Sequence, residues 1–193
     1  MNFWERILYL LQEYGTSYLK GAGTTLVIAL VSTAIGCLIG FIVGIIQTIP
    51  EDKHRDSLLK KIVLKIVKII LKIYVEVFRG TPMIVQAVFI YYGAAQIFNI
   101  QMGMWQSAFL IVSINTGAYM AESVRGGIIS VDPGQTEGAK AIGMTHVQTM
   151  TNVILPQAFR NILPQIGNNL IINIKDTSVL SIISIVDLFF VHK

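Results

Sequence analysis

The chain has 193 residues, of which 53% are hydrophobic and only 13% are charged, and its formal net charge is +4. This length allows one domain, and so apolar a composition excludes an ordinary soluble core. Charge-free stretches cover residues 21–50 and 80–121, and a membrane-spanning helix needs only ~20 apolar residues. The sequence therefore predicts one all-α domain, a polytopic membrane helix bundle, over residues 1–193.

The first twenty residues mix charged and aromatic side chains. A cleavable signal peptide begins with positive charge and ends in a small-residue cleavage site, so residues 1–20 instead predict an amphipathic lead-in at the membrane surface. The first span is predicted at 24–47. Gly36, Gly40 and Gly44 recur there at every fourth residue, which favours close helix packing, although glycine is also simply common in membrane helices.

A basic segment follows at residues 51–79, with Lys and Arg outnumbering Asp and Glu. From Lys61 to Arg79 the charges share one helical face, so we expect this helix to lie along the membrane surface or enter it obliquely, with lysines reaching the headgroups. The Gly-Thr-Pro sequence at 80–82 predicts a break. The remaining predicted spans are the stretch from the break to about residue 92, then 106–122 and 161–178, followed by an apolar tail at 180–191.

The basic segment also indicates orientation. A basic stripe can bind nucleic acid, but in so apolar a chain it more simply marks the cytoplasmic side. The short loop between the second and third spans contains no Lys or Arg. The basic segment is therefore expected in the cytoplasm and the uncharged loop outside. With about four spans, this orientation places the N-terminus outside and the segment 125–160 in the cytoplasm.

This cytoplasmic segment has a pattern of two short helices. Asp132-Pro133-Gly134 predicts a turn, Thr136 a helix N-cap, Gly143 the end of the first helix and Pro156 the end of the second. Such a two-helix elbow suits insertion into a groove on a soluble partner, although any cytoplasmic loop can form a helical hairpin.

The elbow resembles the EAA loop of ABC importer permeases, which reads Glu-Ala-Ala, three residues, Gly, nine residues, Ile, any residue, Leu-Pro. The matching residues here are Glu137, Gly138, Ala139, Gly143, Val153, Leu155 and Pro156. Gly138 and Val153 depart from the pattern, and Gly138 should weaken its helix by ~1 kcal/mol relative to alanine. The resemblance implies a type I ABC importer permease-like fold, coupled through residues 137–156 to an ATPase.

Residues 74–86, 117–139 and 155–181 resemble the polar amino-acid branch of that family, the histidine/glutamine type. The resemblance implies a bacterial inner or plasma membrane, membrane lipid as surroundings and an amino-acid substrate. Its implied partners are an ATP-binding ABC subunit, a second permease copy in a homo- or heterodimer, and an extracytoplasmic solute-binding protein. Family members continue after the apolar tail into one more span. We therefore expect that span to be missing, the chain to be shortened, and the tail to be left uncovered.

Polar residues inside the predicted spans are candidates for the substrate pathway, since charges and amides there usually face a bundle interior or a water-filled path. These residues are Gln86, Asn115, Asn169 and Asp176. The alternative role is to hold helices together. Glu122 and Arg125 are three residues apart and are expected to pair on one helix face, in a structural or gating role.

Nothing in the sequence predicts catalysis, so ATP hydrolysis is expected in a separate subunit and no cofactor in this chain. The histidines His54, His146 and His192 are scattered and predict no metal site. No phosphate-binding GxxxxGK[ST] loop occurs. A small secondary transporter or channel that works without ATP is the alternative interpretation, and a membrane scaffold without transport is a weaker third.

Overall fold

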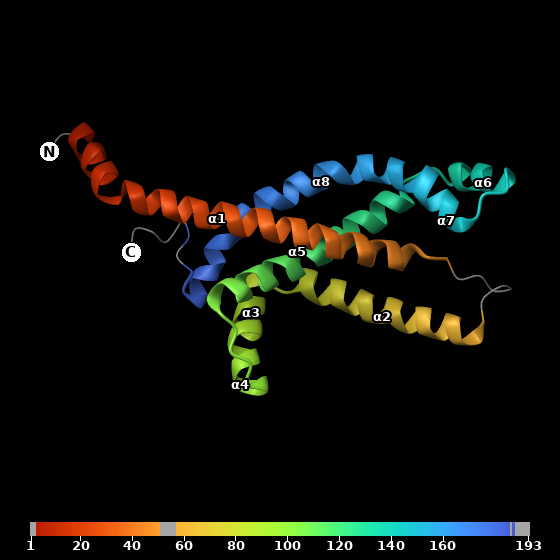
Figure 1. The fold of residues 1–193 in the computed structure, drawn as a ribbon, viewed down its shortest axis with the longest axis horizontal. Helices are drawn as coiled ribbons and strands as arrows, with labels where there is room; N and C mark the ends of the chain where they lie inside the picture. The colour runs from red at the N-terminus through yellow and green to blue at the C-terminus, as the bar shows by residue number, and fades with distance from the viewer. Residues whose placement is uncertain (1–2, 51–56, 186, 188–193) are drawn as a thin grey trace.

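The computed structural model describes residues 3–50, 57–185 and 187. Every regular element in this part of the chain is helical, and two long helices, α1 (Phe3–Thr48) and α5 (Met104–Ile129), form its centre. The helices α2 (Leu58–Gly80) and α8 (Leu155–Asp176) lie alongside this pair (Figure 1). The predicted fold class is confirmed, because the chain is a helix bundle.

The glycine stripe of α1 packs directly against α5. A Cβ atom added at Gly36 would lie 2.6 Å from Thr116 Cβ, and one added at Gly44 would lie 2.7 Å from Val124 Cβ. Real side chains do not approach so closely, so only glycine lets the two backbones come together here. The predicted close packing is confirmed, and α1 runs without interruption from the lead-in through the first predicted span.

The break predicted at residues 80–82 is present. Helix α2 ends at Gly80, Thr81 and Pro82 are extended, and a new helical stretch runs through α3 (Met83–Val88), the π-helical segment η1 (Phe89–Gly93) and α4 (Ala94–Phe98). This stretch turns away from α2 at an angle (Figure 1). It extends beyond the predicted end near residue 92 because the left-handed backbone of Asn99, with φ 54°, ends it instead.

Helix α8 differs from the predicted fourth span at both ends. It begins at Leu155 rather than near residue 161, and it ends at Asp176 rather than near residue 178. A 3₁₀ helix, η3 (Thr177–Ile183), then leads back toward α3. Leu180 and Ile183 are almost fully buried against the cluster around Ile28 and Ile111. The expectation that this part of the tail is left uncovered is therefore wrong, while residues 186 and 188–191 lie outside the described residues.

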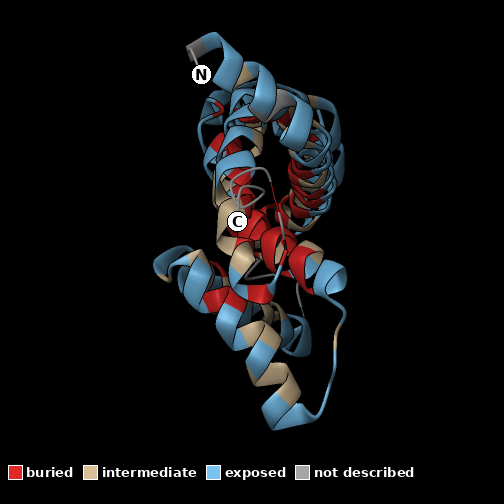
Figure 2. Ribbon diagram, turned by 90° about the vertical axis from the view of Figure 1, so that its left-hand side faces the viewer, coloured by how far each residue is buried: buried red, intermediate tan, exposed pale blue. Residues whose placement is uncertain are grey.

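Burial is concentrated along the centre of the bundle, and the outer helical faces are exposed (Figure 2). Large apolar side chains of α1 and α2 account for much of that exposed surface, and so large an apolar surface indicates contact with a partner or with lipid. Within the described residues one helical stretch, Gln12–Thr48 of α1, is long and apolar enough to cross a membrane, and Met83–Phe98 is a shorter apolar stretch.

Candidate functional site: the elbow and two cavities

The elbow lies at the end of the molecule where α1 ends and α2 begins (Figure 1). Its first helix is α6 (Pro133–Ala141), and its second is α7 (His146–Thr149), which continues through the π-helical segment η2 (Met150–Ile154) into α8. Both N-termini are capped. Asp132 Oδ1 accepts a hydrogen bond from the Gly134 backbone at 2.7 Å, and Thr145 Oγ1 accepts one from the Gln148 backbone.

Two details of the predicted elbow are wrong. Asp132, not Thr136, is the N-cap, because Pro133 occupies the first helical position, where a missing N–H costs nothing. Pro156 does not stop the second helix but lies in the first turn of α8. The wider π-helical turn of η2 comes directly before it, and the chain continues as helix from His146 to Asp176.

Gly143 makes the turn between the two helices, as predicted. Its φ is +85°, a backbone conformation that costs glycine little and other residues more. The Gly143 N–H donates to Lys140 O at 2.9 Å, and the Met144 N–H donates to Ala139 O at 3.0 Å. These bonds satisfy carbonyls at the end of α6, in the manner of a glycine C-cap.

The EAA-like residues divide between two sides of the elbow. Ala139 is buried, and Val153 and Leu155 are half-buried against the cluster that joins η2 and α8 to α5. The others, Glu137, Gly138, Gly143 and Pro156, are exposed. Sequence reasoning missed two apolar residues at the tip, Ile142 and Val147, which are 77% and 68% exposed. Their signal was available, since both are large aliphatic residues beside the Gly143 turn.

Three of the four candidate pathway residues line one cavity of about 180 Å³ between α5 and α8, here called the amide cavity. Its lining residues are Thr81, Pro82, Met83, Asn115, Thr116, Tyr119, Asn169, Ile172, Asn173 and Asp176. The candidates among them are Asn115, Asn169 and Asp176. Asn173 was missed, although Asn169, Asn173 and Asp176 have the spacing of four and three that places residues on one helical face.

The fourth candidate, Gln86, is buried beside the amide cavity rather than among its lining residues. Its Nε2 donates to the carbonyl oxygens of Phe78 and Thr81, both at 2.9 Å. Its Oε1 accepts a hydrogen bond from Asn115 Nδ2 at 3.0 Å. Gln86 therefore fixes the α2–α3 break and orients Asn115, which matches the interhelical role considered for it.

A second cavity of about 490 Å³, here called the charged cavity, lies between α2 and the α1–α5 pair. Its lining residues are Gln47, Lys68, Lys72, Val75, Glu76, Arg79, Glu122 and Arg125. The charged face of α2 thus lines this cavity, and the aliphatic side chains on the rest of the helix are exposed as well. Lys68 Nζ donates to Ile49 O at 2.6 Å, so its side chain is held at the end of α1, whereas the Lys72 side chain is 71% exposed. That the lysines reach the headgroups stays a prediction, because helical periodicity shows which residues share a face but not what that face meets.

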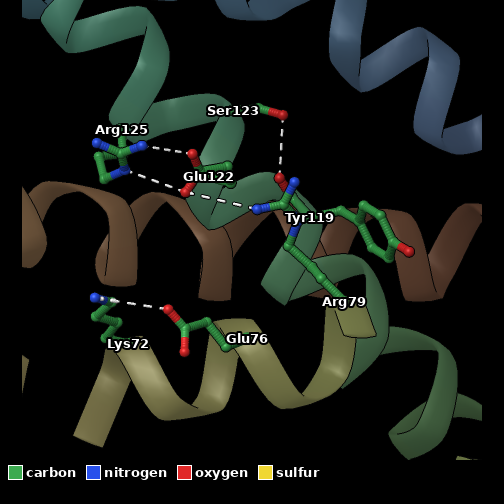
Figure 3. Close-up of polar contacts among 7 residues, drawn as sticks. All are labelled: Lys72, Glu76, Arg79, Tyr119, Glu122, Ser123 and Arg125. Carbon is green, nitrogen blue, oxygen red and sulfur yellow. Dashed lines mark hydrogen bonds and ion pairs between the residues drawn. The ribbon is translucent and has the colours of Figure 1, made fainter. Parts of the chain in front are cut away.

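The predicted Glu122–Arg125 pair is present and bidentate (Figure 3). Arg125 Nε and one terminal nitrogen donate to the two carboxylate oxygens at 3.1 and 2.5 Å. Arg79 reaches the same carboxylate from α2 at 3.7 Å. Its guanidinium also lies 5.7 Å from the centre of the Tyr119 ring, within cation–π range. Among the described residues no group of three or more His, Cys, Asp or Glu could hold a metal ion, and His54 and His192 lie outside them.

Residues 63–190 match the family model described as "Binding-protein-dependent transport system inner membrane component". This match covers most of the chain, and the chain belongs to that family, whose members are membrane proteins. The elbow, α8 and every lining residue of the two cavities except Gln47 fall within the matched region.

Among curated proteins, the chain is similar to the glutamine transport system permease protein GlnP of Escherichia coli (strain K12), with 42% identity over 115 residues. That alignment covers 59% of this chain and 52% of the relative. The L-cystine transport system permease protein TcyB of Bacillus subtilis (strain 168) is 45% identical over 115 residues, covering 60% and 49%. The chain spans about half the length of the curated relatives it matches.

Among solved structures, an amino acid ABC transporter crystallised with histidines has a chain of similar fold, with a TM-score of 0.80 and 34% identity. The similarity covers 97% of this chain and 79% of that one. The methionine ABC transporter MetNI in an inward-facing form has a TM-score of 0.68 at 21% identity, covering 95% and 77%. The second similarity concerns the fold alone.

Proposed function

We propose that this chain is the transmembrane permease subunit of an ATP-driven ABC importer for a polar amino acid. The observation that carries the proposal is the elbow: a capped two-helix unit at one end of an apolar bundle, with Ile142 and Val147 exposed at its tip. Exposed aliphatic side chains on a polar loop are typical of a docking surface. The permease names of the relatives in several amino-acid transport systems support the same function.

The elbow would dock onto an ATP-binding ABC subunit, which binds and hydrolyses ATP in place of this chain. The other proposed partners are a second permease copy, identical or not, and an extracytoplasmic solute-binding protein. The chain would cross a bacterial inner or plasma membrane several times with its N-terminus outside and residues 125–160 inside. The aliphatic outer face of α2 supports this placement, since that face would meet lipid while the charged face meets the charged cavity.

The amide cavity is the proposed substrate site on the pathway. Asp176 would bind the ammonium group of an amino acid, and Asn115 and Asn169 would hydrogen-bond to its polar atoms. These side chains lie on two helices, α5 and α8, so a relative tilt of the helices would change the cavity. Gln86 would not contact the substrate but would hold Asn115 in position through the hydrogen bond between the two side chains.

The proposed coupling follows from the continuity of α7, η2 and α8. Ile154 of η2 and Ala158 and Ile162 of α8 share a buried cluster with Met120 and Val124 of α5. Movement of the elbow by an ATPase would therefore be transmitted to α8, which carries Asn169 and Asp176. Packed helices respond by shifting as units, because close-packed interiors transmit strain.

Uptake by the complete complex tests this proposal. The chain is reconstituted into liposomes with an ATP-binding ABC subunit and a solute-binding protein of an amino-acid transport system, and uptake of L-glutamine, L-arginine and L-cystine is measured. The proposal predicts uptake that requires ATP on the elbow side and is insensitive to ion gradients. Uptake driven by an ion gradient without ATP would favour the alternative, a small secondary transporter or channel. No response to any substrate would favour a scaffold.

A further inference from the structure

The contact between Arg79 and Tyr119 joins one lining residue of each cavity. Arg79 lines the charged cavity, and Tyr119 lines the amide cavity. The guanidinium carbon lies 5.7 Å from the ring centre, and Figure 3 shows the Arg79 side chain reaching from α2 toward Tyr119 and Glu122 on α5. A solute moving from one cavity to the other along α5 would pass this contact.

The amide cavity lacks a partner for one half of an amino acid. Asp176 can bind an ammonium group, but none of the described residues that line this cavity is Lys or Arg. Among the residues that line the charged cavity, Arg79 contacts a residue of the amide cavity, Tyr119, and can receive the carboxylate of a zwitterion held there. Arginine suits this role because its planar guanidinium binds a carboxylate through two parallel hydrogen bonds.

Of the two arginines at Glu122, Arg79 exchanges its partner more easily. Arg125 holds Glu122 through two hydrogen bonds, whereas Arg79 approaches the same carboxylate only to 3.7 Å. The Arg79 and Glu122 side chains are 41% and 33% exposed, and exposed ion pairs contribute little to stability. A zwitterion could replace this pair, its carboxylate on Arg79 and its ammonium on Glu122, with no net loss of charge pairing.

We propose that the charged cavity is a second binding compartment for the transported amino acid, on the elbow side of the Arg79–Tyr119 contact. Arg79 binds the substrate carboxylate and Glu122, held by Arg125, binds its ammonium group. This inference rests on the proposed transport function and extends it from one binding site to two in sequence. Lys68 and Lys72 keep the compartment net positive, so it retains the carboxylate end of the substrate after the ammonium has left Asp176.

Substrate protection of a thiol tests the second compartment in the complete complex. A Lys72→Cys variant is made in a Cys37→Ala background, since Lys72 is an exposed residue at this cavity and the remaining lining residues stay net positive without it. The probe is whichever of L-glutamine, L-arginine and L-cystine the wild-type complex takes up. The probe should slow labelling of the introduced thiol by a reagent added on the elbow side. Adding Arg79→Gln should raise the concentration of probe that gives half-maximal protection about tenfold, because the substrate carboxylate loses one charged hydrogen-bonding partner. Arg79→Lys should give a smaller rise.

The controls separate the possible outcomes. A Leu59→Cys variant, exposed on the same helix but outside the cavity, should label at the same rate with and without the probe. The methyl ester of the probe, which has no carboxylate charge, should fail to protect the thiol of Lys72→Cys. This control needs no substitution at Arg79, so it holds even if the Arg79 variants do not fold. Equal protection by inorganic phosphate would reveal an anion site only and overturn the proposal.

Uptake by the wild-type complex distinguishes this inference from the proposed function. If the wild-type complex takes up an amino acid that gives no protection at Lys72→Cys, the second compartment is wrong and the permease function stands. If the wild-type complex takes up none of the three amino acids, the proposed function itself fails and this inference fails with it.

Discussion

Asn173 donates a hydrogen bond from Nδ2 to Thr33 Oγ1 at 2.7 Å, although the two residues are 140 positions apart in the chain. The same amide exchanges hydrogen bonds with Thr116, at 2.9 Å as donor and 3.1 Å as acceptor. Asn173 therefore joins α8 to both central helices, α1 and α5, at the wall of the amide cavity. A buried amide with all its partners in place fixes the relative register of three helices.

Asn173→Ala should destabilise the bundle. The substitution leaves the hydroxyl groups of Thr33 and Thr116 buried without their shared partner. The loss of such a partner costs ~1–3 kcal/mol in soluble proteins and ~0.6–1.7 kcal/mol between membrane helices. The measurement is the thermal midpoint of the purified protein in detergent. Asn168→Ala is the matched control, because Asn168 is the same residue type on the same helix but is exposed. Equal midpoints for the two variants would contradict the role given to Asn173.

Gly40→Val should disrupt the contact between α1 and α5. An added side chain at Gly40 meets the backbone of α5 at Met120 and Ala121, and overpacking a close-packed interface costs typically ~1–3 kcal/mol or more. Gly23→Val is the control, because nothing lies within 4 Å of a Cβ atom at Gly23. The yield of folded protein on gel filtration should fall for Gly40→Val alone. Similar yields for both would show that the stripe is not an interface.

Two alanine substitutions in the elbow should act in opposite directions. Gly138 lies inside α6 with open space around it, so Gly138→Ala should stabilise that helix by up to ~1 kcal/mol. Gly143 also has open space, but its φ of +85° means that Gly143→Ala should destabilise the turn by ~1 kcal/mol. Amide hydrogen exchange of residues 137–142 should be slower in the first variant and faster in the second. Exchange changing in the same direction in both would rule out this conformational explanation.

Thiol labelling tests the proposed membrane orientation. In a Cys37→Ala background, Ser57→Cys and Gln135→Cys should react with an impermeant reagent only from the cytoplasmic side, and Gln101→Cys only from outside. The reason is the excess of Lys and Arg over residues 51–79, most of them in α2 itself, and their absence between α4 and α5. Labelling from the reverse sides would overturn the topology, and labelling of Gln101→Cys from the same side as Gln135→Cys would overturn the span count.

The sequence predicted the elbow well because its signals are local. A proline after Asp132, a glycine at 143 and the aliphatic spacing of Val153 and Leu155 each act on their own turn of helix. The Thr136 cap was wrong because Asp132 is an equally good capping residue that comes first in the chain. The continuous helix through Pro156 was missed because a proline at a helix start and one after a helix end look alike unless the preceding turn is known.

The two cavities were less predictable, since they depend on which faces of distant helices meet. Periodicity grouped Lys68, Lys72 and Arg79 on one face but did not reveal that this face turns toward α5. All four pathway candidates, three of which line the amide cavity, were chosen because amides and carboxylates in apolar spans are costly and seldom accidental. Tyr119 and Thr116 were missed because aromatic and hydroxyl residues in a span carry no such cost, and Asn173 because its partners lie on other helices.

Coupling through the elbow is the central claim, and substrate-stimulated ATP hydrolysis by the reconstituted complex tests it most directly. Gly143→Asp places a charge on the turn beside Ile142, with no bundle contact to disturb because Gly143 is exposed. Gln101→Asp is the control, a similar charge on a loop outside the elbow. We predict that Gly143→Asp inserts normally but loses substrate stimulation of ATP hydrolysis, while Gln101→Asp retains it. Full stimulation in Gly143→Asp would contradict the account.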